Sequence, residues 1–306
     1  MTHLARSMIA AISLLILAIA PTHAATSLAD LPLLIDRQLP MVEVMFDRGK
    51  RMPCMIDLGA QFNTMPIALG RSVGVEREGA FTDDGAGWTR YTRRVSAKLR
   101  MNDATVRKQE FFLRGVNLKT VDGPLSVCIL GHPFIREFTV DIDGLSGRLR
   151  LFPAKSAAGA VAGTTTRFSK RDGFMTVPVV LDGVAAQAFV DSGAAISEIN
   201  RRLQDDRGIG DNDSRLAEPR SIVTLHGAVR GSPTVKLGKI QWAGQSIARP
   251  KPMLQHSDSM LARFFGSGTP AMLLGWDVLQ HARFVIDWTG NTYSVSVETR
   301  VAAEMP

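Results

Sequence analysis

Two hydrophobic runs in this chain end in the same short motif, Asp-x-Gly-Ala. Residues 55–60 read MIDLGA, and residues 189–194 read FVDSGA. Each run is typical of a buried strand, and the glycine permits a sharp turn after the acidic residue because it lacks a Cβ atom. A carboxylate at the end of a buried strand is costly to leave without a partner. The pattern therefore predicts two matching units whose acidic residues, Asp57 and Asp191, face each other.

The spacing of the two motifs extends well beyond them. Asp57 and Asp191 are separated by 191 − 57 = 134 residues, and the same offset relates positions on both sides. Apolar residues downstream of each motif have the i, i+3, i+7 spacing of a short helix. A spacing that repeats within one chain in this way indicates two diverged copies of one unit, an internal duplication. Pairs at this offset include Met41 with Met175, Gly49 with Gly183, Phe62 with Ile196, Met65 with Ile199, and Leu69 with Leu203.

A second motif also occurs twice. Residues 129–131 read ILG and residues 273–275 read LLG, and each is followed by a strand-like run that ends in Asp. The offset is now 275 − 131 = 144, so the second copy has ten more residues between its two motifs. Loops tolerate such insertions at a small cost in free energy. Each copy thus contributes one acidic residue and one apolar-apolar-Gly strand.

Strand and turn signals dominate the remaining sequence. The 306 residues are 45% hydrophobic and 21% charged, which is typical of a folded protein. Residues 94–101 alternate strictly between polar and apolar side chains and predict a half-exposed strand. Asp182-Gly183 predicts a hairpin turn. Residues 234–237 and 239–242 predict a further hairpin.

Residues 1–24 differ from the rest of the chain. Arg6 precedes a short apolar run at residues 8–20, and the segment ends in a small residue, Ala24. This is the pattern of a secretory signal peptide, although an uncleaved N-terminal anchor is an alternative. We therefore expect the mature chain to be secreted or periplasmic.

Together these motifs resemble those of the retropepsin and pepsin-type aspartic peptidases. The arrangement is similar to the bacterial secreted members that carry two retropepsin-like units in one chain. The resemblance implies an all-β fold of two pseudo-two-fold-related, retropepsin-like (pepsin-type) β-barrel lobes, with short helices and an active cleft between the lobes. The expected domains are a signal peptide (1–24), an N-terminal lobe (25–152), a linker rich in small residues (153–166) and a C-terminal lobe (167–306).

The resemblance also implies the chemistry. It places Asp57 and Asp191 at the floor of the cleft, beside the two apolar-apolar-Gly strands, with flaps near residues 85–87 and near Gly227. Two carboxylates in contact cannot both ionise, so they share one proton. The ionised one can take a proton from a water that attacks a peptide carbonyl, while the protonated one donates to the carbonyl oxygen. We therefore predict an aspartic endopeptidase, a hydrolase without cofactor or metal, that is most active at mildly acidic pH.

The predicted active-site loops, Leu58-Gly59 and Ser192-Gly193, depart from the family pattern at one position. The family has Thr or Ser after each catalytic Asp, and these hydroxyl groups interlock between the lobes. Ser192 fits this pattern, whereas Leu58 has no hydroxyl. Gln61 and Ala195 also stand where a hydroxyl residue is often found. An alternative interpretation is therefore a catalytically impaired protein of the same fold, acting as a periplasmic binding or scaffolding module.

The two cysteines, Cys54 and Cys128, each lie three residues before a motif residue. Because the family places these strands side by side, a disulfide under the active-site floor is a hypothesis, and export would permit it. Two buried free thiols are the alternative. Since one chain carries both acidic residues, we expect a monomer that binds a peptide or protein substrate. We expect no nucleic-acid partner and no membrane span after signal removal.

Other chemistries find little support in the sequence. The six histidines are scattered, and neither a zinc-binding motif nor a serine nucleophile elbow occurs. Acidic residues between positions 205 and 213 are interpreted as a solvated loop, with a calcium site as the alternative. Paired carboxylates also serve glycosidases, but those folds lack this duplicated motif. The net charge of +7 is interpreted as basic residues on solvated strand faces.

Overall fold

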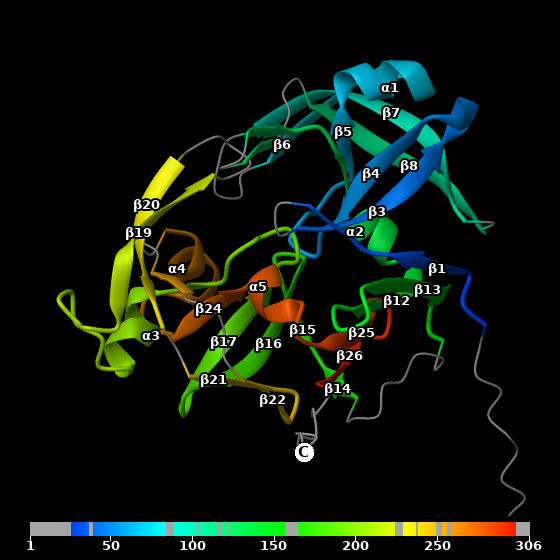
Figure 1. Ribbon diagram of the computed structural model, residues 1–306. Helices are drawn as coiled ribbons and strands as arrows, with labels where there is room; N and C mark the ends of the chain where they lie inside the picture. Colours follow the sequence, from blue (N-terminus) through cyan, green and yellow to red (C-terminus); the bar gives the residue numbers. More distant parts are fainter. Residues whose placement is uncertain are drawn as a thin grey trace, which may run out of the picture.

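The computed structural model consists mainly of β-strands, and its few helices are short (Figure 1). Each half of the chain forms one lobe, and strands from both halves share a third sheet. The predicted signal peptide and the predicted flap tips at residues 85–87 and 227 lie outside the described residues. The structure describes residues 26–36, 39–83, 89–102, 104–114, 118–120, 123–156, 165–223, 229–236, 238–248, 253–255 and 259–297.

The N-terminal lobe contains a closed barrel. Its sheet runs in the order β2-β3-β4-β11-β5-β8-β7-β6, and an additional pairing of β3 with β7 closes the six strands from β3 to β7 into a ring. Closure of a sheet on itself removes unpaired strand edges. The strands are β2 (Leu34–Asp36), β3 (Leu39–Phe46), β4 (Arg51–Ile56), β5 (Thr64–Pro66), β6 (Glu76–Asp83), β7 (Thr89–Met101), β8 (Ala104–Arg114) and β11 (Cys128–Leu130).

Strand β7 shows how the sequence pattern sets the interior of this barrel. Its apolar residues Val95, Ala97, Leu99 and Met101 are all buried, whereas the polar residues between them are not. Successive side chains of a strand point to opposite faces of the sheet, so strict alternation gives one face to the core and one to solvent. The predicted half-exposed strand is therefore confirmed.

The C-terminal lobe has a similar but open sheet, in the order β19-β20-β23-β18-β24-β17-β16-β21-β22. No pairing among the described residues joins its two ends, and β15 pairs separately with β16. The strands are β15 (Ser169–Arg171), β16 (Phe174–Leu181), β17 (Val184–Val190), β18 (Glu198–Ile199), β19 (Leu216–Val223), β20 (Val229–Val235), β21 (Lys239–Trp242), β22 (Gln245–Ala248), β23 (Met253–Gln255) and β24 (Ala271–Leu274).

Two hairpins were predicted in this lobe, with different outcomes. Asp182 and Gly183 have φ angles of 45° and 91° and connect β16 to β17, as the Asp-Gly pair predicts. The hairpin predicted from residues 234–242 is wrong, because β21 pairs with β22 and not with β20. The actual turn is at Ala243-Gly244, where both residues have positive φ angles.

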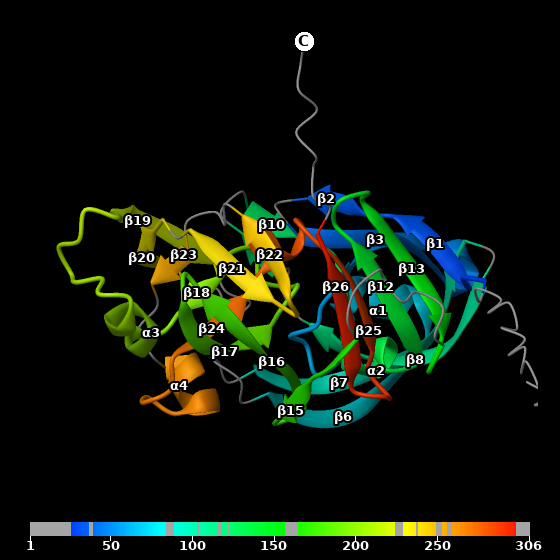
Figure 2. The same ribbon diagram turned by 90° about the horizontal axis from the view of Figure 1, so that it is seen from below.

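The third sheet joins the two halves of the chain. It runs in the order β1-β13-β12-β25-β26-β14, and β12 of the first half pairs antiparallel with β25 of the second. Figure 2 shows β12, β13, β25 and β26 side by side. Its strands are β1 (Ala29–Pro32), β12 (Phe138–Asp143), β13 (Arg148–Pro153), β14 (Thr166–Arg167), β25 (Arg283–Asp287) and β26 (Thr292–Ser296).

A buried ion pair ties the halves together within this sheet. The carboxylate of Asp141 on β12 is fully buried and accepts two hydrogen bonds from Arg283 on β25, at 3.0 and 2.8 Å. Arg150 on β13 donates a third bond at 3.2 Å. Bidentate bonding to arginine fixes geometry as well as charge, so this cluster sets the position of β25 against β12.

The helices are short and begin later than the sequence pattern predicts. The expected helix at residues 62–69 is instead β5 followed by helix α1 (Ile67–Val73). Pro66 explains the shift, because the residue before a proline is driven towards extended conformations. In the second half, Asn200 caps helix α3 (Arg201–Asp206) by accepting a bond from the Leu203 amide at 2.9 Å. None of the helices in the described part of the chain is long and apolar enough to cross a lipid bilayer.

Corresponding elements of the two halves lie at the offsets found in the sequence. Strands β4 and β17 end at Ile56 and Val190, and β11 and β24 end at Leu130 and Leu274. The elements directly before β11 and β24 differ. The first half has a hairpin of β9 (Leu118–Thr120) and β10 (Gly123–Leu125), whereas the second has helix α4 (Ser259–Phe265). A common origin of the halves and the predicted domain boundaries stay predictions.

The structure contains the hypothesised disulfide. Cys54 on β4 and Cys128 on β11 are direct partners in a parallel strand pair, with Cα atoms 4.5 Å apart, and both are fully buried. At the same offsets the C-terminal lobe has Ala188 and Met272. The bond therefore reinforces only the floor beneath Asp57.

We expect the double variant Cys54→Ala/Cys128→Ala to fold but to lose stability. Because the bond spans 74 residues, its loss should lower the free energy of unfolding by roughly 4 kcal/mol. Urea denaturation of the wild type and the double variant measures this loss. Thiol titration of the denatured, unreduced wild type is the control, and two free thiols there would contradict the disulfide.

Candidate active site

Each predicted catalytic residue directly follows a buried strand that pairs with an apolar-apolar-Gly strand. The amide of Asp57 donates to the carbonyl oxygen of Leu130 at 3.0 Å. The amide of Asp191 donates to the carbonyl oxygen of Leu274, also at 3.0 Å. The ILG and LLG strands therefore lie beside the two Asp loops, as the sequence predicts.

The two loops have nearly the same local geometry. The Gly59 amide donates to Oδ1 of Asp57 at 2.8 Å, and the Gly193 amide donates to Oδ1 of Asp191 at 2.9 Å. In both loops the alanine amide donates to the backbone oxygen of the Asp at 3.3 Å. Asp favours such turns because its side chain can bond to a backbone amide two residues on. The loops thereby orient their own carboxyl groups.

The glycines of the motif are required by contact between the lobes. A Cβ atom at Gly59 would overlap the carboxyl group of Asp191, and a Cβ atom at Gly193 would overlap that of Asp57. Each glycine therefore leaves room for the acidic side chain of the opposite lobe. The structure brings Asp57, Asp191, Gly59 and Gly193 together at one place between the lobes.

The two carboxyl groups lie close enough to affect each other's ionisation, and two carboxylates in contact cannot both ionise, so we infer that they share one proton. Burial and then the neighbouring charge of Asp191 raise the pKa of Asp57 well above its usual value. Burial also raises the pKa of Asp191, although the bonds from Asp57 and from the Gly193 amide oppose this effect. The two carboxyl groups therefore titrate as one unit.

Ser192 and Leu58 form half of the interlock that the family resemblance implies. The Ser192 hydroxyl accepts a hydrogen bond from the Leu58 amide at 3.0 Å and donates one to the carbonyl oxygen of Ile56 at 2.7 Å. Leu58 has no hydroxyl group with which to form the reciprocal bonds to the Asp191 loop, and its side chain is buried in the hydrophobic core. One hydroxyl therefore holds the Asp57 loop from the opposite lobe.

His132 was missed by the sequence analysis. It is the first residue of helix α2 (His132–Ile135), is buried, and its Nε2 atom lies 2.8 Å from the carbonyl oxygen of Leu58. Burial, with the charges of Lys170 and Arg136, lowers the pKa of His132 to about 4, so the ring is neutral at mildly acidic pH. The sequence feature that could have identified His132 is its position directly after the ILG motif, where the second copy has Trp276.

Gln61 provides another contact between the lobes. Its side-chain amide donates to the carbonyl oxygen of Asp172 at 2.6 Å, in the turn between β15 and β16. Gln61 occupies a position where the family often has a hydroxyl residue. Here it attaches the Asp57 loop to the first hairpin of the C-terminal lobe.

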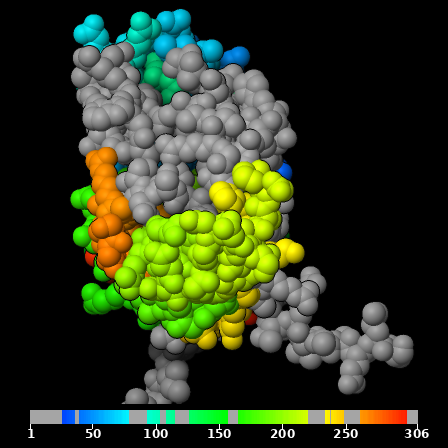
Figure 3. Space-filling model, turned by 90° about the vertical axis from the view of Figure 1, so that its left-hand side faces the viewer, coloured from blue at the N-terminus to red at the C-terminus, as the bar shows by residue number. Residues whose placement is uncertain are grey.

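The acidic residues of the predicted solvated loop are paired with arginines. Asp205 and Asp211 both contact Arg201, at 2.8 and 2.6 Å, and Asp213 contacts Arg215. Figure 3 shows the face of the C-terminal lobe on which this segment lies, in yellow-green. Within the described residues, no group of three or more His, Cys, Asp or Glu side chains could hold a metal ion.

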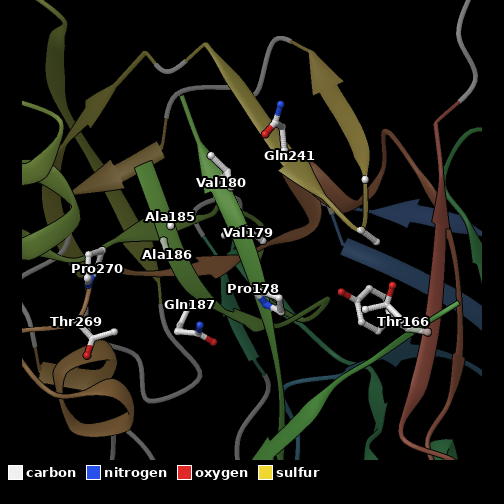
Figure 4. Close-up of a pocket in the computed structure, with 13 residues that line it drawn as sticks. Thr166, Pro178, Val179, Val180, Ala185, Ala186, Gln187, Gln241, Thr269 and Pro270 are labelled. Carbon is white, nitrogen blue, oxygen red and sulfur yellow. The ribbon is translucent and has the colours of Figure 1, made fainter. Parts of the chain in front are cut away.

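A cavity of about 740 Å³ lies elsewhere on the C-terminal lobe. Its lining includes Pro178 and Val180 of β16, Gln187 of β17 and Gln241 of β21 (Figure 4). Neither Asp57 nor Asp191 lines it. The predicted cleft over the two carboxyl groups would be bounded partly by flap tips outside the described residues, so it stays a prediction.

Comparison with solved structures identifies the fold. The chain is similar to the crystal structure of an aspartic proteinase from Irpex lacteus, with a TM-score of 0.57 over 90% of this chain and 98% of that chain. The two sequences are 11% identical, so the likeness shows a shared pepsin-like fold and nothing further. No protein-family model and no curated protein sequence matches this chain. The predicted two-lobed, all-β, pepsin-like fold is confirmed.

The raised pKa values predict how stability depends on pH. A carboxyl whose pKa is raised in the folded state stabilises the fold below its unfolded value, about 3.9, and this contribution is lost as the pH rises through the raised value. We therefore expect Asp57→Asn to be more stable than the wild type at neutral pH. The difference between their free energies of unfolding should shrink as the pH is lowered towards about 4. Its full size should be about 1.4 kcal/mol for each unit by which the pKa of Asp57 is raised.

Urea denaturation of both proteins at several pH values measures this difference. Asp205→Asn is the matched control, because it makes the same chemical change at an exposed side chain. If the Asp57→Asn variant had the same pH dependence as the wild type, Asp57 would not have a raised pKa.

Proposed function

We propose that this chain is a secreted aspartic endopeptidase that hydrolyses peptide bonds with Asp57 and Asp191. The observation that carries the proposal is the placement of the two carboxyl groups, each in one of two matched loops and each against the motif glycine of the other loop. The pepsin-like fold supports it, because a solved structure of similar fold is described as an aspartic proteinase. Leu58, Gly59, Ser192 and Gly193 would form the loops that hold the pair.

The proposed mechanism gives each carboxyl group one role. Asp191, ionised, would take a proton from a water molecule while the water oxygen attacks the peptide carbonyl carbon. Asp57, protonated, would donate its proton to the carbonyl oxygen, which gives a neutral diol. In the second step Asp191 would protonate the leaving nitrogen, Asp57 would take a proton from one hydroxyl, and the C–N bond would break. This sequence restores the starting protonation of both carboxyl groups.

The same assignment fixes the direction of the pH dependence. Activity would fall at low pH because Asp191 becomes protonated, and at high pH because Asp57 loses its proton. Burial raises the pKa values of both Asp57 and Asp191. The acidic and the alkaline limit of activity therefore both move towards neutral pH. The proposed enzyme is therefore most active in mildly acidic solution.

Partners and location follow as parts of the proposal. One chain supplies both carboxyl groups, so we propose a monomer that binds a peptide or protein substrate. The buried disulfide favours an oxidising compartment, in agreement with the signal-like pattern of residues 1–24. A periplasmic or secreted location accounts for both features.

The alternative function, an inactive binding or scaffolding module, rests on the missing hydroxyl of Leu58. Ser192 nevertheless bonds to both neighbouring backbone groups, and Asp57 and Asp191 accept equivalent amide bonds. The Asp57 loop is therefore held in a geometry close to that of its partner. This favours the hydrolase.

Digestion of casein or a peptide library across about pH 4 to 7 tests the proposal, since a shared-proton pair should act in this range. We expect the wild type to cleave, and Asp57→Asn and Asp191→Asn to lose about 10²- to 10⁴-fold in rate, as expected for the loss of a general acid or base. Circular dichroism should confirm that both variants fold. Asp205→Asn again serves as the control and should cleave normally.

Two results would count against the proposal. Complete inertness of the wild type across this pH range would favour the binding module. Wild-type activity in either Asn variant would show that the proposed residues do not carry the reaction.

A further inference from the structure

We propose that His132 is a positioning residue for Asp57, because it holds the Leu58 carbonyl and, through the same peptide unit, the amide that bonds to the Asp57 carboxyl group. The inference rests on the proposed function for its effect on catalysis. Its structural part, the fixing of one peptide unit by one side chain, can be tested without activity.

Side chains contact three backbone groups around Asp57. Ser192 bonds to the carbonyl oxygen of Ile56 and to the amide of Leu58. His132 bonds to the remaining group, the carbonyl oxygen of Leu58, at 2.8 Å. A carbonyl oxygen can only accept a hydrogen bond, so Nε2 of His132 must carry the proton and donate it.

The peptide unit that His132 holds is the one that bonds to the catalytic carboxyl. The carbonyl of Leu58 and the amide of Gly59 belong to the same planar group, and that amide donates to Oδ1 of Asp57 at 2.8 Å. Fixing the carbonyl therefore fixes the direction of the amide on its other side. Hydrogen bonds in such a chain also strengthen one another.

The His132 ring is held by contacts from both lobes. Its own backbone amide donates to the carbonyl oxygen of Ala60 at 2.8 Å, which attaches α2 to the Asp57 loop. Its ring packs against Trp288 with centroids 4.3 Å apart, and the edge contact with Phe174 is at 5.7 Å. Both aromatic residues belong to the second half of the chain. A donor whose orientation is locked by packing is suited to hold a catalytic group in place.

Among the residues that the structure describes, the Asp191 loop has no equivalent contact. Trp276 occupies the position of His132 at the first residue of helix α5 (Trp276–Leu279), and its amide likewise bonds to the carbonyl oxygen of Ala194. Its indole Nε1 has no hydrogen-bond partner in the described part of the chain. Among the described residues, the side chain at this position therefore holds the Asp57 loop and not the Asp191 loop.

Replacement of His132 by Phe and by Gln separates the donor from the ring. His132→Phe keeps an aromatic ring against Trp288 but removes the donor, and we expect kcat to fall about 10- to 100-fold with little change in KM. The alkaline limb of the pH profile should move to higher pH, because a weaker Gly59 bond stabilises ionised Asp57 less. His132→Gln supplies an amide donor and should recover part of kcat.

Equal kcat values for the wild type and His132→Phe would contradict the proposed positioning role. Thermal melts of the wild type, His132→Phe and His132→Gln identify any variant that does not fold.

Hydrogen exchange provides the readout that does not depend on activity. In His132→Phe the amides of residues 58–60 should exchange faster, whereas those of residues 192–194, the matched internal control, should not change. Equal acceleration of both segments, or of neither, would overturn the inference even if the wild type is an active peptidase. If the wild type is inert, the proposed function fails, and the exchange result still decides whether His132 fixes this loop.

Discussion

The contact between the carboxyl groups of Asp57 and Asp191 is the constraint on which the rest of this structure depends. Each group alone would be costly to bury, and together they can be accommodated only by sharing a proton. The motif glycines lack side chains because each opposes the other lobe's carboxyl, and the loop amides bond to the carboxylate oxygens. The strands, turns and lobe contacts nearby all serve to keep Asp57 and Asp191 in this arrangement.

The two loops reach similar geometries by different means. A symmetrical pair of hydroxyl groups would let each lobe hold the other, but Leu58 leaves only Ser192 to do so. The first half adds a buried disulfide beneath its loop and a histidine on the Leu58 carbonyl, and neither has a counterpart at the corresponding positions. The half of the chain that has Leu58 in place of a hydroxyl residue therefore also has two stabilising groups, the disulfide and His132, that the other half lacks at the corresponding positions.

Much of this arrangement could be predicted from the sequence because it repeats there. The matched offsets identified both Asp loops and the strands beside them, and regular alternation identified β7. Local features without a repeat were harder to predict: Pro66 delays the first helix, and a turn at Ala243-Gly244 redirects β21 away from β20. His132 could not be predicted, because its role depends on a carbonyl oxygen 74 residues earlier and on aromatic rings from the other half.

The relative position of the lobes is set by contacts that lie close to the shared floor. The pairing of β12 with β25, reinforced by Asp141 and Arg283, joins the halves in one sheet. Gln61 and Ser192 add hydrogen bonds directly between the Asp57 loop and the C-terminal lobe. Separating the lobes at this level would break these bonds and expose the buried carboxyl group of Asp57. The floor that orients the two carboxyl groups is therefore also part of the interface that joins the two halves of the chain.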